Sequence, residues 1–303
     1  MHCYSLNRPG RRTCKLPVVL AAALVLAAGD VALGEADWHA GYIEPSAPFH
    51  FRVERFQDNP IIHRELPGLE GNLGNNINGP SLIRVPEWIE DPLGTYYLYF
   101  AHHHGRFIRL AYADALKGPW TVHEPGVLPM EDTPISHGRR GDHVASPDVH
   151  LDVERERIVM YYHGPNPPGG PRGQGTYVAV SGDGLDFEAR DEYLGWFYFR
   201  VFQHGGWHYA LAKYGNDGGI MYRSRHGLSG FETGPRILPR VRHKALWKHD
   251  NMLYVFFSCE TRPSTKRMAA CSCCIRRRAS TRLPSPKSSS KKAAPELDNM
   301  EAI

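Results

Sequence analysis

A weak internal repeat runs through residues 78–258 and constrains the fold of this chain more than any other feature. Each unit begins with a short apolar strand, passes a polar turn and continues into a strand rich in aromatic residues. Tyrosines align between four units, about 45–60 residues apart, at Tyr99, Tyr161, Tyr209 and Tyr254. Repeats of this length with several strands each are typical of the blades of a β-propeller.

Three of the units add a further strand and then a closing aromatic residue, which is Trp120, Phe187 or Phe231. The turns at residues 181–184 and 225–227 contain glycine, which tolerates the positive φ that such turns need. Short β-branched and aromatic strands with almost no helical periodicity predict an all-β fold. A propeller must close on itself to remove its sheet edges, so four visible blades predict an apparently incomplete ring.

The composition and charge of the chain narrow the possible partners. Its 303 residues are 42% hydrophobic and 22% charged, which excludes intrinsic disorder and a polytopic membrane protein. The formal net charge is +4, but the basic groups are concentrated at the two ends. Residues 35–258 carry 22 Lys and Arg against 27 Asp and Glu, so we expect no nucleic-acid partner.

Residues 1–34 have the pattern of a secretory signal peptide: four basic residues, an uncharged run at residues 16–29 and small residues before a cleavage point. The run is shorter than the roughly 20 apolar residues that span a bilayer, so we expect no stable membrane insertion. A secreted or periplasmic protein is the resulting prediction. The alternative is a wrongly assigned start codon with a spurious leader.

Residues 259–303 differ in character from the predicted propeller body at residues 35–258. The strand pattern stops, aromatic residues vanish, and a basic run rich in Ser, Pro and Lys follows. This composition predicts a disordered basic tail. A sharper hypothesis is a frameshift, because the strand at residues 253–257 otherwise ends in mid-fold. The tail cysteines lack a zinc-site spacing, and the body contains no cysteine.

Four stretches carry a family resemblance: residues 76–81 (NINGPS), 97–103 (YLYFAHH), 145–150 (ASPDVH) and the pair Arg242 and His243. With these motifs the chain resembles the five-bladed β-propeller glycosidase-like proteins, the group around glycoside hydrolase families 43, 32 and 117, over roughly residues 56–258. The resemblance implies a five-bladed propeller with a sugar-binding funnel on its axis. It also implies catalytic groups on the innermost strand of successive blades.

Hydrolysis of a glycosidic bond needs a carboxylic acid to protonate the leaving oxygen and a carboxylate to activate water. Asp148 matches the position of a third carboxylate that commonly tunes the acid in these families; the alternative is a strand-start aspartate that binds backbone amides. At the place of the expected base this sequence has Asn78, an amide that cannot accept a proton at neutral pH. Asp58 is a weak substitute for the base. His243 is a candidate acid, because a histidine has that role in one related family, or else a contact to sugar or anion.

The other candidate residues are predicted to bind substrate in the funnel: His102, His103, His150, Arg200 and Arg242. His150 and His163 could join His102 or His104 at a metal, but histidine is an expected hydrogen-bonding residue in a polar funnel, so we predict neither a metal nor another cofactor. Arg109 and Arg200 lie inside apolar strands, where an unpaired charge is costly. They are therefore either salt-bridged in the core or in contact with a substrate carboxylate.

Taken together, the sequence predicts a secreted glycoside hydrolase-like protein that acts on O-glycosidic bonds of poly- or oligosaccharides, with a carbohydrate as its partner. A carbohydrate-binding propeller without catalysis is the first alternative, favoured by Asn78 and by the lack of a clear acid. An inactive, truncated gene product is the second, favoured by the abrupt tail. Fold analogy alone does not decide between them.

Overall fold

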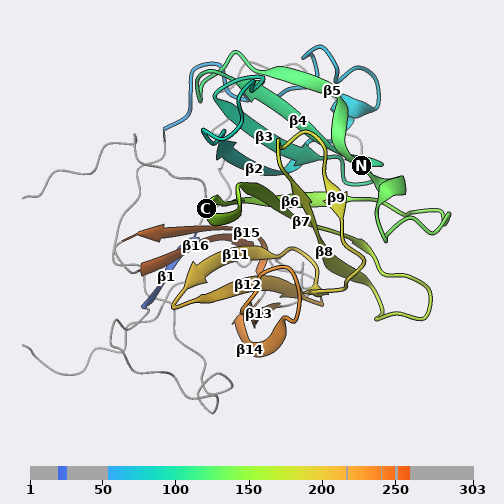
Figure 1. Ribbon diagram of the computed structural model, residues 1–303, viewed down its shortest axis with the longest axis vertical. Coiled ribbons are helices and arrows are strands. Elements are labelled where there is room, and N and C mark those ends of the chain that lie inside the picture. Colours follow the sequence, from blue (N-terminus) through green and yellow to red (C-terminus); the bar gives the residue numbers. More distant parts are fainter. Residues whose placement is uncertain (1–19, 26–53, 216–217, 240, 250–251, 260–303) are drawn as a thin grey trace, which may run out of the picture.

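The computed structural model describes residues 20–25, 54–215, 218–239, 241–249 and 252–259, and these form four antiparallel sheets (Figure 1). The first sheet contains β2 (Asn78–Arg84), β3 (Tyr96–Ala101), β4 (Phe107–Ala113) and β5 (Thr121–Pro129). The second contains β6 (Ala145–Asp152), β7 (Arg157–Pro165), β8 (Gln174–Ser181), β9 (Glu188–Ala189) and β10 (Gly195–Trp196).

The third sheet contains β11 (Arg200–His204), β12 (Trp207–Tyr214), β13 (Gly218–Ser224) and β14 (Glu232–Pro239). The fourth contains β15 (Val241–His249), β16 (Met252–Cys259) and β1 (Leu20–Val25). Three short 3₁₀ helices, η2 (Leu73–Asn75), η3 (Met130–Asp132) and η4 (Val153–Arg155), are the helical pieces among the described residues.

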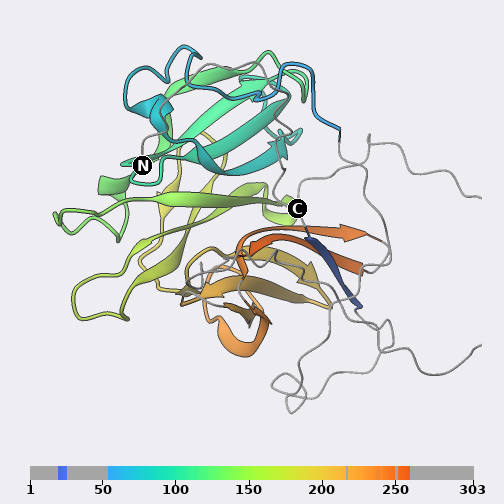
Figure 2. The same ribbon diagram turned by 180° about the vertical axis from the view of Figure 1, so that it is seen from behind.

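The first strands of the four sheets, β2, β6, β11 and β15, lie next to one another in the middle of the molecule, and the later strands lie farther out (Figures 1 and 2). β2 packs against β6 and β11 packs against β15. Within the first and third sheets consecutive strands are neighbours, and in the second β6, β7 and β8 follow one another while β9 and β10 each pair with β8. Sequential up-and-down sheets with their first strands at the centre are the architecture of propeller blades. The predicted all-β propeller fold is therefore confirmed.

The same irregularity recurs where the first strands begin. The register shifts between Asn78 and Ser81 in β2, between Ala145 and Asp148 in β6, and between Val241 and Lys244 in β15. Two residues before Ser81, Asp148 and Arg200 the backbone has a positive φ, at Gly79 (60°), Ser146 (49°) and Tyr198 (61°). The positions equivalent to one another in the four sheets are thus Ser81, Asp148, Arg200 and Lys244.

Neighbouring first strands are joined through these equivalent positions. The backbone N–H of Val149 donates to Ser81 Oγ at 2.9 Å, and that of Val201 donates to Asp148 Oδ2 at 2.8 Å. Gly79 approaches the next strand so closely that a Cβ there would lie 2.6 Å from the Cα of Ser146. Apolar side chains fill the space between successive sheets, and the largest cluster lies between the first and second. The sheets are therefore fixed relative to one another by packing and by these buried hydrogen bonds.

The ring of sheets is open in the described part of the chain, where no strand pairs the fourth sheet with the first. The outer edge of β16 pairs instead with β1, which falls within the predicted signal peptide. The remainder of residues 1–34 and the predicted tail from residue 260 onward lie outside the described residues, so the predicted leader and tail stay predictions. No helix among the described residues has both the length and the apolarity needed to cross a membrane.

Candidate functional site at the mouth of the sheets

Strand pairing brings one end of every sheet to a common region, which we call the mouth. There the first strand of a sheet begins and its second strand ends: Asn78 is opposite Ala101, Ala145 is opposite His163, and the N–H of Lys213 donates to the carbonyl of Phe197 at 2.9 Å. The fourth sheet contributes the start of β15, at residues 241–244. The mouth therefore collects side chains from four separate parts of the sequence.

A row of rings crosses the mouth from sheet to sheet. The centre of the His103 ring is 6.4 Å from that of His143, and His143 is 6.5 Å from His163. Tyr198 continues the row, with ring centres 4.3 Å from His163 and 5.3 Å from His243. Every sheet is represented, so these residues mark where the surfaces of the four blades meet.

Basic side chains surround this row of rings. Lys244 Nζ lies 5.8 Å from the centre of the Tyr198 ring, and Lys213 Nζ lies 5.6 Å from the centre of Phe197. We call the set formed by the row of rings and these basic groups the mouth cluster: His103, His143, His163, Tyr198, Arg200, Lys213, Arg242, His243 and Lys244.

Two buried polar atoms of the mouth cluster have no hydrogen-bond partner, Lys244 Nζ and His163 Nδ1. Burial lowers the pKa of Lys244 well below 10.5, and the nearby Arg200 lowers it further. Burial likewise lowers the pKa of His163 well below 6.5, with added repulsion from His143 and Arg200. Buried polar groups in proteins are nearly always hydrogen-bonded, so this pair needs a polar partner from outside the described residues.

Asp148 is the carboxylate next to this cluster, and it is buried with only 4% of its surface exposed. Its Oδ2 is 2.9 Å from His150 Nε2 and accepts the N–H of Val201, while its Oδ1 is 3.5 Å from Arg200 Nη1. Arg200 also donates from Nε to the carbonyl of Lys244 at 3.1 Å. Asp148 and Arg200 thus join the second, third and fourth sheets.

The electrostatics of Asp148 fit an ionised, structural carboxylate. Burial alone would raise its pKa, but the charges of His150 and Arg200 and the hydrogen bonds to it lower the pKa below 3.8 overall. A carboxyl group with a lowered pKa is a poor proton donor at neutral pH. Asp148 accepts one backbone N–H, that of Val201, as the structural alternative describes, and its role as the carboxylate that tunes a catalytic acid stays a prediction.

Asn78 and the histidines after β3 meet at the first sheet. The side-chain amide of Asn78 donates to Asn76 Oδ1, which also accepts the N–H of His103 at 2.9 Å. His102 Nδ1 accepts the N–H of His104 at 3.0 Å. The pKa of His102 is lowered by burial first and then by the charge of Arg109, and that of His103 by burial and by His104. Asn78 therefore supports the turn that carries His103.

Of the other predicted contacts, Arg242 and His243 follow Val241 at the start of β15, and much of each side chain is exposed at the mouth. Partial desolvation of the ring and the charges of Arg242 and Lys213 lower the pKa of His243 to about 4. This histidine is consequently neutral at pH 7 and binds a proton only in acid. In the described residues no group of three or more His, Cys, Asp or Glu is placed to hold a metal ion.

The contacts of Arg109 are with residues outside the mouth cluster. Its guanidinium donates to the carbonyls of Leu73 at 2.6 Å and Asn76 at 2.8 Å, and it lies 4.5 Å from the centre of the Phe100 ring. Neither sequence hypothesis for Arg109 describes this arrangement, because its partners are backbone carbonyls. Arg200 does form the expected buried ion pair, with Asp148.

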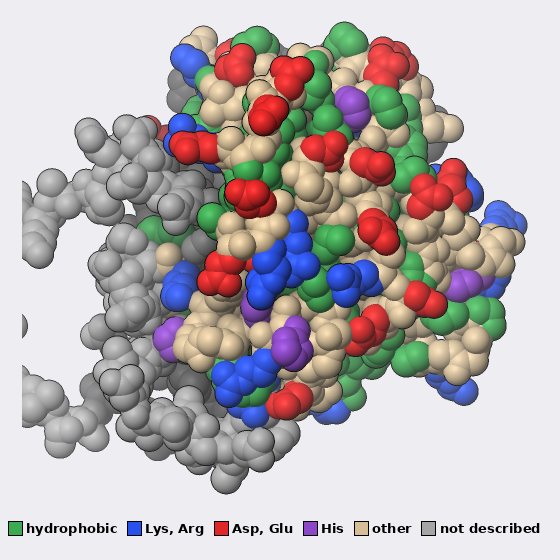
Figure 3. Space-filling view, viewed as in Figure 1, with side chains coloured by type: hydrophobic (Ala, Val, Ile, Leu, Met, Phe, Trp, Pro, Cys, Tyr) green, Lys and Arg blue, Asp and Glu red, His purple; other side chains and the backbone are tan. Residues whose placement is uncertain are grey.

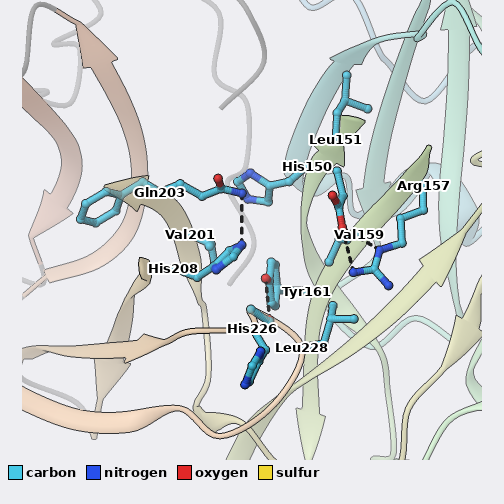
Figure 4. A pocket seen from close by; sticks show the side chains of 13 residues that line it. His150, Leu151, Arg157, Val159, Tyr161, Val201, Gln203, His208, His226 and Leu228 are labelled. Carbon is cyan, nitrogen blue, oxygen red and sulfur yellow. Dashed lines mark hydrogen bonds and ion pairs between the residues drawn. The ribbon is translucent and has the colours of Figure 1, made fainter. Parts of the chain in front are cut away.

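His150 faces a second region, a small cavity at the other end of the second and third sheets (Figure 4). The cavity has a volume of about 40 Å³ and is lined by His150, Tyr161, His208 and their neighbours. Two of its polar contacts are between lining residues: Gln203 Nε2 is 3.1 Å from His208 Nε2, and Tyr161 donates to the carbonyl of Gly227 at 2.7 Å. His208 Nδ1 is buried there without a hydrogen-bond partner. A cavity of this size has room for water but not for a sugar ring.

Acidic and basic side chains are unevenly distributed over the face of the molecule seen in Figure 3. Asp and Glu predominate over the sheet of β2–β5, whereas Lys, Arg and His gather nearer the middle, where the first strands of the sheets converge. A body with a net negative charge thus presents basic groups near its centre.

Sequence reasoning missed Tyr198, Lys213 and Lys244. Each stands in a stretch that reads as an ordinary strand or turn, and none belongs to the motifs that carry the resemblance. The repeat could have indicated Lys244, because Lys244 occupies in the fourth unit the position that Asp148 and Arg200 occupy in the second and third. His163 had been considered only as a metal ligand.

The chain is 30% identical over 233 residues to the uncharacterised protein R118 of Acanthamoeba polyphaga mimivirus, which covers 67% of this chain; the chain spans 64% of the length of that relative. No protein-family model matches the sequence.

Among solved structures, the chain resembles an α-L-arabinofuranosidase of family 43 from Clostridium thermocellum, with a TM-score of 0.41 and 17% identity over 53% of this chain and 56% of that one. It also resembles a family 117 glycoside hydrolase from Zobellia galactanivorans, with a TM-score of 0.40 and 17% identity over 60% and 61%. A family 32 β-fructofuranosidase from Bombyx mori gives a TM-score of 0.38 and 12% identity over 59% and 41%. These are the three glycosidase groups indicated by the sequence motifs. The likenesses are distant, so the blade architecture rests on the strand pairing described above.

Proposed function

We propose that this protein binds a carbohydrate at the mouth of its sheets and does not hydrolyse it by the two-carboxylate route. The observation that carries the proposal is the pair of buried polar atoms without a hydrogen-bond partner, Lys244 Nζ and His163 Nδ1, in two side chains that both lie near the Tyr198 ring. A ligand rich in hydroxyl groups offers these atoms the partners they lack, and the ring of Tyr198 offers an apolar surface beside them. The motifs shared with glycosidase-like propellers favour a sugar over other polar ligands.

The absence of catalysis is inferred from the chemistry of the candidate groups. Asp148 is buried and accepts hydrogen bonds and ion pairs through both oxygens, which leaves it poorly placed to activate a water molecule. Asn78 stands where a base is expected. His243, with a pKa of about 4, is not protonated at neutral pH and so lacks the proton that a general acid must donate.

A glycoside hydrolase is the second candidate function, because Asp148 and His243 both lie at or beside the mouth. Any hydrolysis that used His243 as the acid would require a pH near 4, where this histidine begins to be protonated. Extracellular action accompanies both proposals, since the leader predicted in residues 1–34 would carry the protein to the compartment where polysaccharides occur.

The test measures binding and turnover on the same purified full-length protein. Isothermal titration calorimetry with a panel of plant and algal oligosaccharides is expected to detect a ligand, while a reducing-sugar assay at pH 7 and at pH 4.5 detects no release. Release at pH 4.5 that disappears in His243→Gln would favour the hydrolase. Failure of every oligosaccharide to bind would overturn the proposal.

A further inference from the structure

We propose that the ligand of the mouth is an acidic saccharide, whose carboxylate or sulfate ester binds beside Lys244 and His163. This inference rests on the proposed function, because it names the class of sugar that the same site takes. It requires the ligand to carry a negative charge, whereas carbohydrate binding as proposed above requires only that the ligand form hydrogen bonds.

The first step of the argument is the environment of Lys244. This side chain comes from β15 and only 7% of its residue surface is exposed, yet its ammonium group has no hydrogen-bond partner. Lysine is almost never buried without a pair, because an isolated buried ammonium ion is strongly disfavoured. The neighbours that act on it electrostatically are mainly basic: Arg200 and Lys213 oppose its charge, and Asp148 is the acidic neighbour.

The second step is that Asp148 is already engaged. Its Oδ2 is hydrogen-bonded to His150 and to the N–H of Val201, and the carboxylate holds a single negative charge. Arg200, with Nη1 3.5 Å from Oδ1, forms an ion pair with that charge. A second negative charge is therefore needed before Lys244 can be protonated at low energetic cost in this buried place.

The third step is the position of His163 near the same tyrosine. His163 is 2% exposed and its Nδ1 also has no hydrogen-bond partner. Lys244 and His163 belong to the fourth and second sheets, and the Tyr198 ring is close to both, with its centre 5.8 Å from Lys244 Nζ and 4.3 Å from the centre of the His163 ring. An anionic group above Tyr198 would reach donors from two blades at once, and charged hydrogen bonds are stronger than neutral ones.

A neutral sugar satisfies these donors less well. Its hydroxyl oxygens accept hydrogen bonds but supply no charge to offset that of Lys244. Because electrostatic interactions are stronger in a partly buried site than in water, the difference between an acidic and a neutral sugar is expected to be large.

The experiment uses the full chain and a pair of ligands that differ only in charge, tri-galacturonic acid and its methyl ester, in isothermal titration calorimetry at pH 7. We expect the acid to bind at least about tenfold more tightly than the ester, the difference made by one charged hydrogen bond. A sulfated galactose oligosaccharide and inorganic sulfate are two further probes. They distinguish a sulfate ester from a carboxylate as the anionic group, and a saccharide from a free anion.

Two matched variants locate the effect. Lys244→Met removes the buried ammonium group, whereas Lys248→Met removes a lysine four residues along the same strand, whose Nζ donates to the carbonyl of Gln203. We expect Lys244→Met to lose at least about tenfold in affinity for the best acidic ligand, and Lys248→Met to stay within about twofold. Thermal melting of each variant without ligand establishes that it is folded. The salt dependence of wild-type binding provides a measurement that needs no variant, since affinity for an acid should fall as salt rises.

The outcomes separate the two proposals. Equal affinity for the acid, the sulfated sugar and the neutral ester, or equal losses in the two lysine variants, would overturn this inference and leave carbohydrate binding in place. Binding of no saccharide at all, including the case in which inorganic sulfate alone binds, would overturn both. Preference for the acid or for the sulfated sugar, lost in Lys244→Met, would establish the site and decide which anionic group it takes.

Discussion

The boundary between the second and third sheets has charged side chains at both of its ends, and these side chains are paired differently at the two ends. At the end with the small cavity, Asp152 forms ion pairs with Arg157 at 2.8 Å and with Arg155 at 3.2 Å. At the mouth, Asp148 is paired with Arg200, and Lys244 Nζ has no hydrogen-bond partner. Charges that support only the fold are usually paired within it, so an unpaired buried cation at one end indicates that this end is built for a ligand.

The largest expected effect comes from breaking the ion pair at the mouth, between Asp148 and Arg200. Asp148→Asn leaves Arg200 without a counter-charge in a buried position, and we expect a loss of about 3–5 kcal/mol in the free energy of unfolding, measured by urea denaturation. The matched change at the other end, Asp152→Asn, should cost about 1 kcal/mol or less, because its arginine partners are partly exposed. Similar losses at the two ends would contradict the contrast.

The second largest effect on the free energy of unfolding is expected from a packing change at the mouth. Gly79→Ala places a Cβ about where the backbone of Ser146 already lies and requires a positive φ, so it should cost about 1–3 kcal/mol in urea denaturation. Gly182 has nothing within 4 Å of the corresponding position. Gly182→Ala should therefore stay within about 0.5 kcal/mol of wild type, and an equal loss would show that the close contact of β2 and β6 is not a constraint.

Removing the unpaired cation should stabilise the ligand-free protein. Lys244→Met replaces an ammonium group without a partner by an apolar group of similar length, and we expect a gain of about 1 kcal/mol in the free energy of unfolding. Lys248→Met should change it by less than about 0.5 kcal/mol. A loss of stability in Lys244→Met, measured under the same conditions, would mean that Lys244 has a structural partner.

The finest test is the pH dependence of stability. His163 and His243 have lowered pKa values when folded, so below their ordinary pKa of 6.5 the unfolded chain binds more protons and the free energy of unfolding falls between pH 6.5 and about 4. Asp148 also has a lowered pKa, and its contribution is lost only below about pH 3.8. Urea denaturation of His163→Gln should show a smaller fall between pH 7 and 4.5 than wild type; an unchanged fall would exclude His163 as a source.

The fold was more predictable than the site, for reasons visible in particular residues. The strand predicted at residues 96–101 is β3, because Tyr97 and Tyr99 pack in one apolar cluster while the alternate residues Leu98 and Phe100 pack in another. The strand predicted at residues 148–151 is longer in the structure, since β6 begins at Ala145 across a bulge that Pro147 and the positive φ of Ser146 create. Strand periodicity is a local property, and the sequence therefore contains it directly.

The mouth cluster depends on which strands become neighbours. Asp148, His150 and Arg200 were predicted separately, yet only the packing of β6 against β11 shows that they form one network. The burial of Lys244 and His163, which distinguishes them from surface residues of the same kind, likewise follows from tertiary structure. For Lys244, a comparison of equivalent positions in the repeat comes nearest to predicting a functional role. The equivalent residues are all polar and lie on strands that face a neighbouring blade: Ser81, Asp148, Arg200 and Lys244.

The most direct test of the account is a structure of the protein in complex with tri-galacturonic acid. We expect the sugar to lie over Tyr198, with a carboxylate oxygen about 3 Å from Lys244 Nζ and within reach of His163. The cavity beside His150 should contain no sugar. A saccharide bound elsewhere, or one at the mouth whose carboxylate points away from Lys244, would contradict the claim that the ammonium group of Lys244 is there to bind an anion.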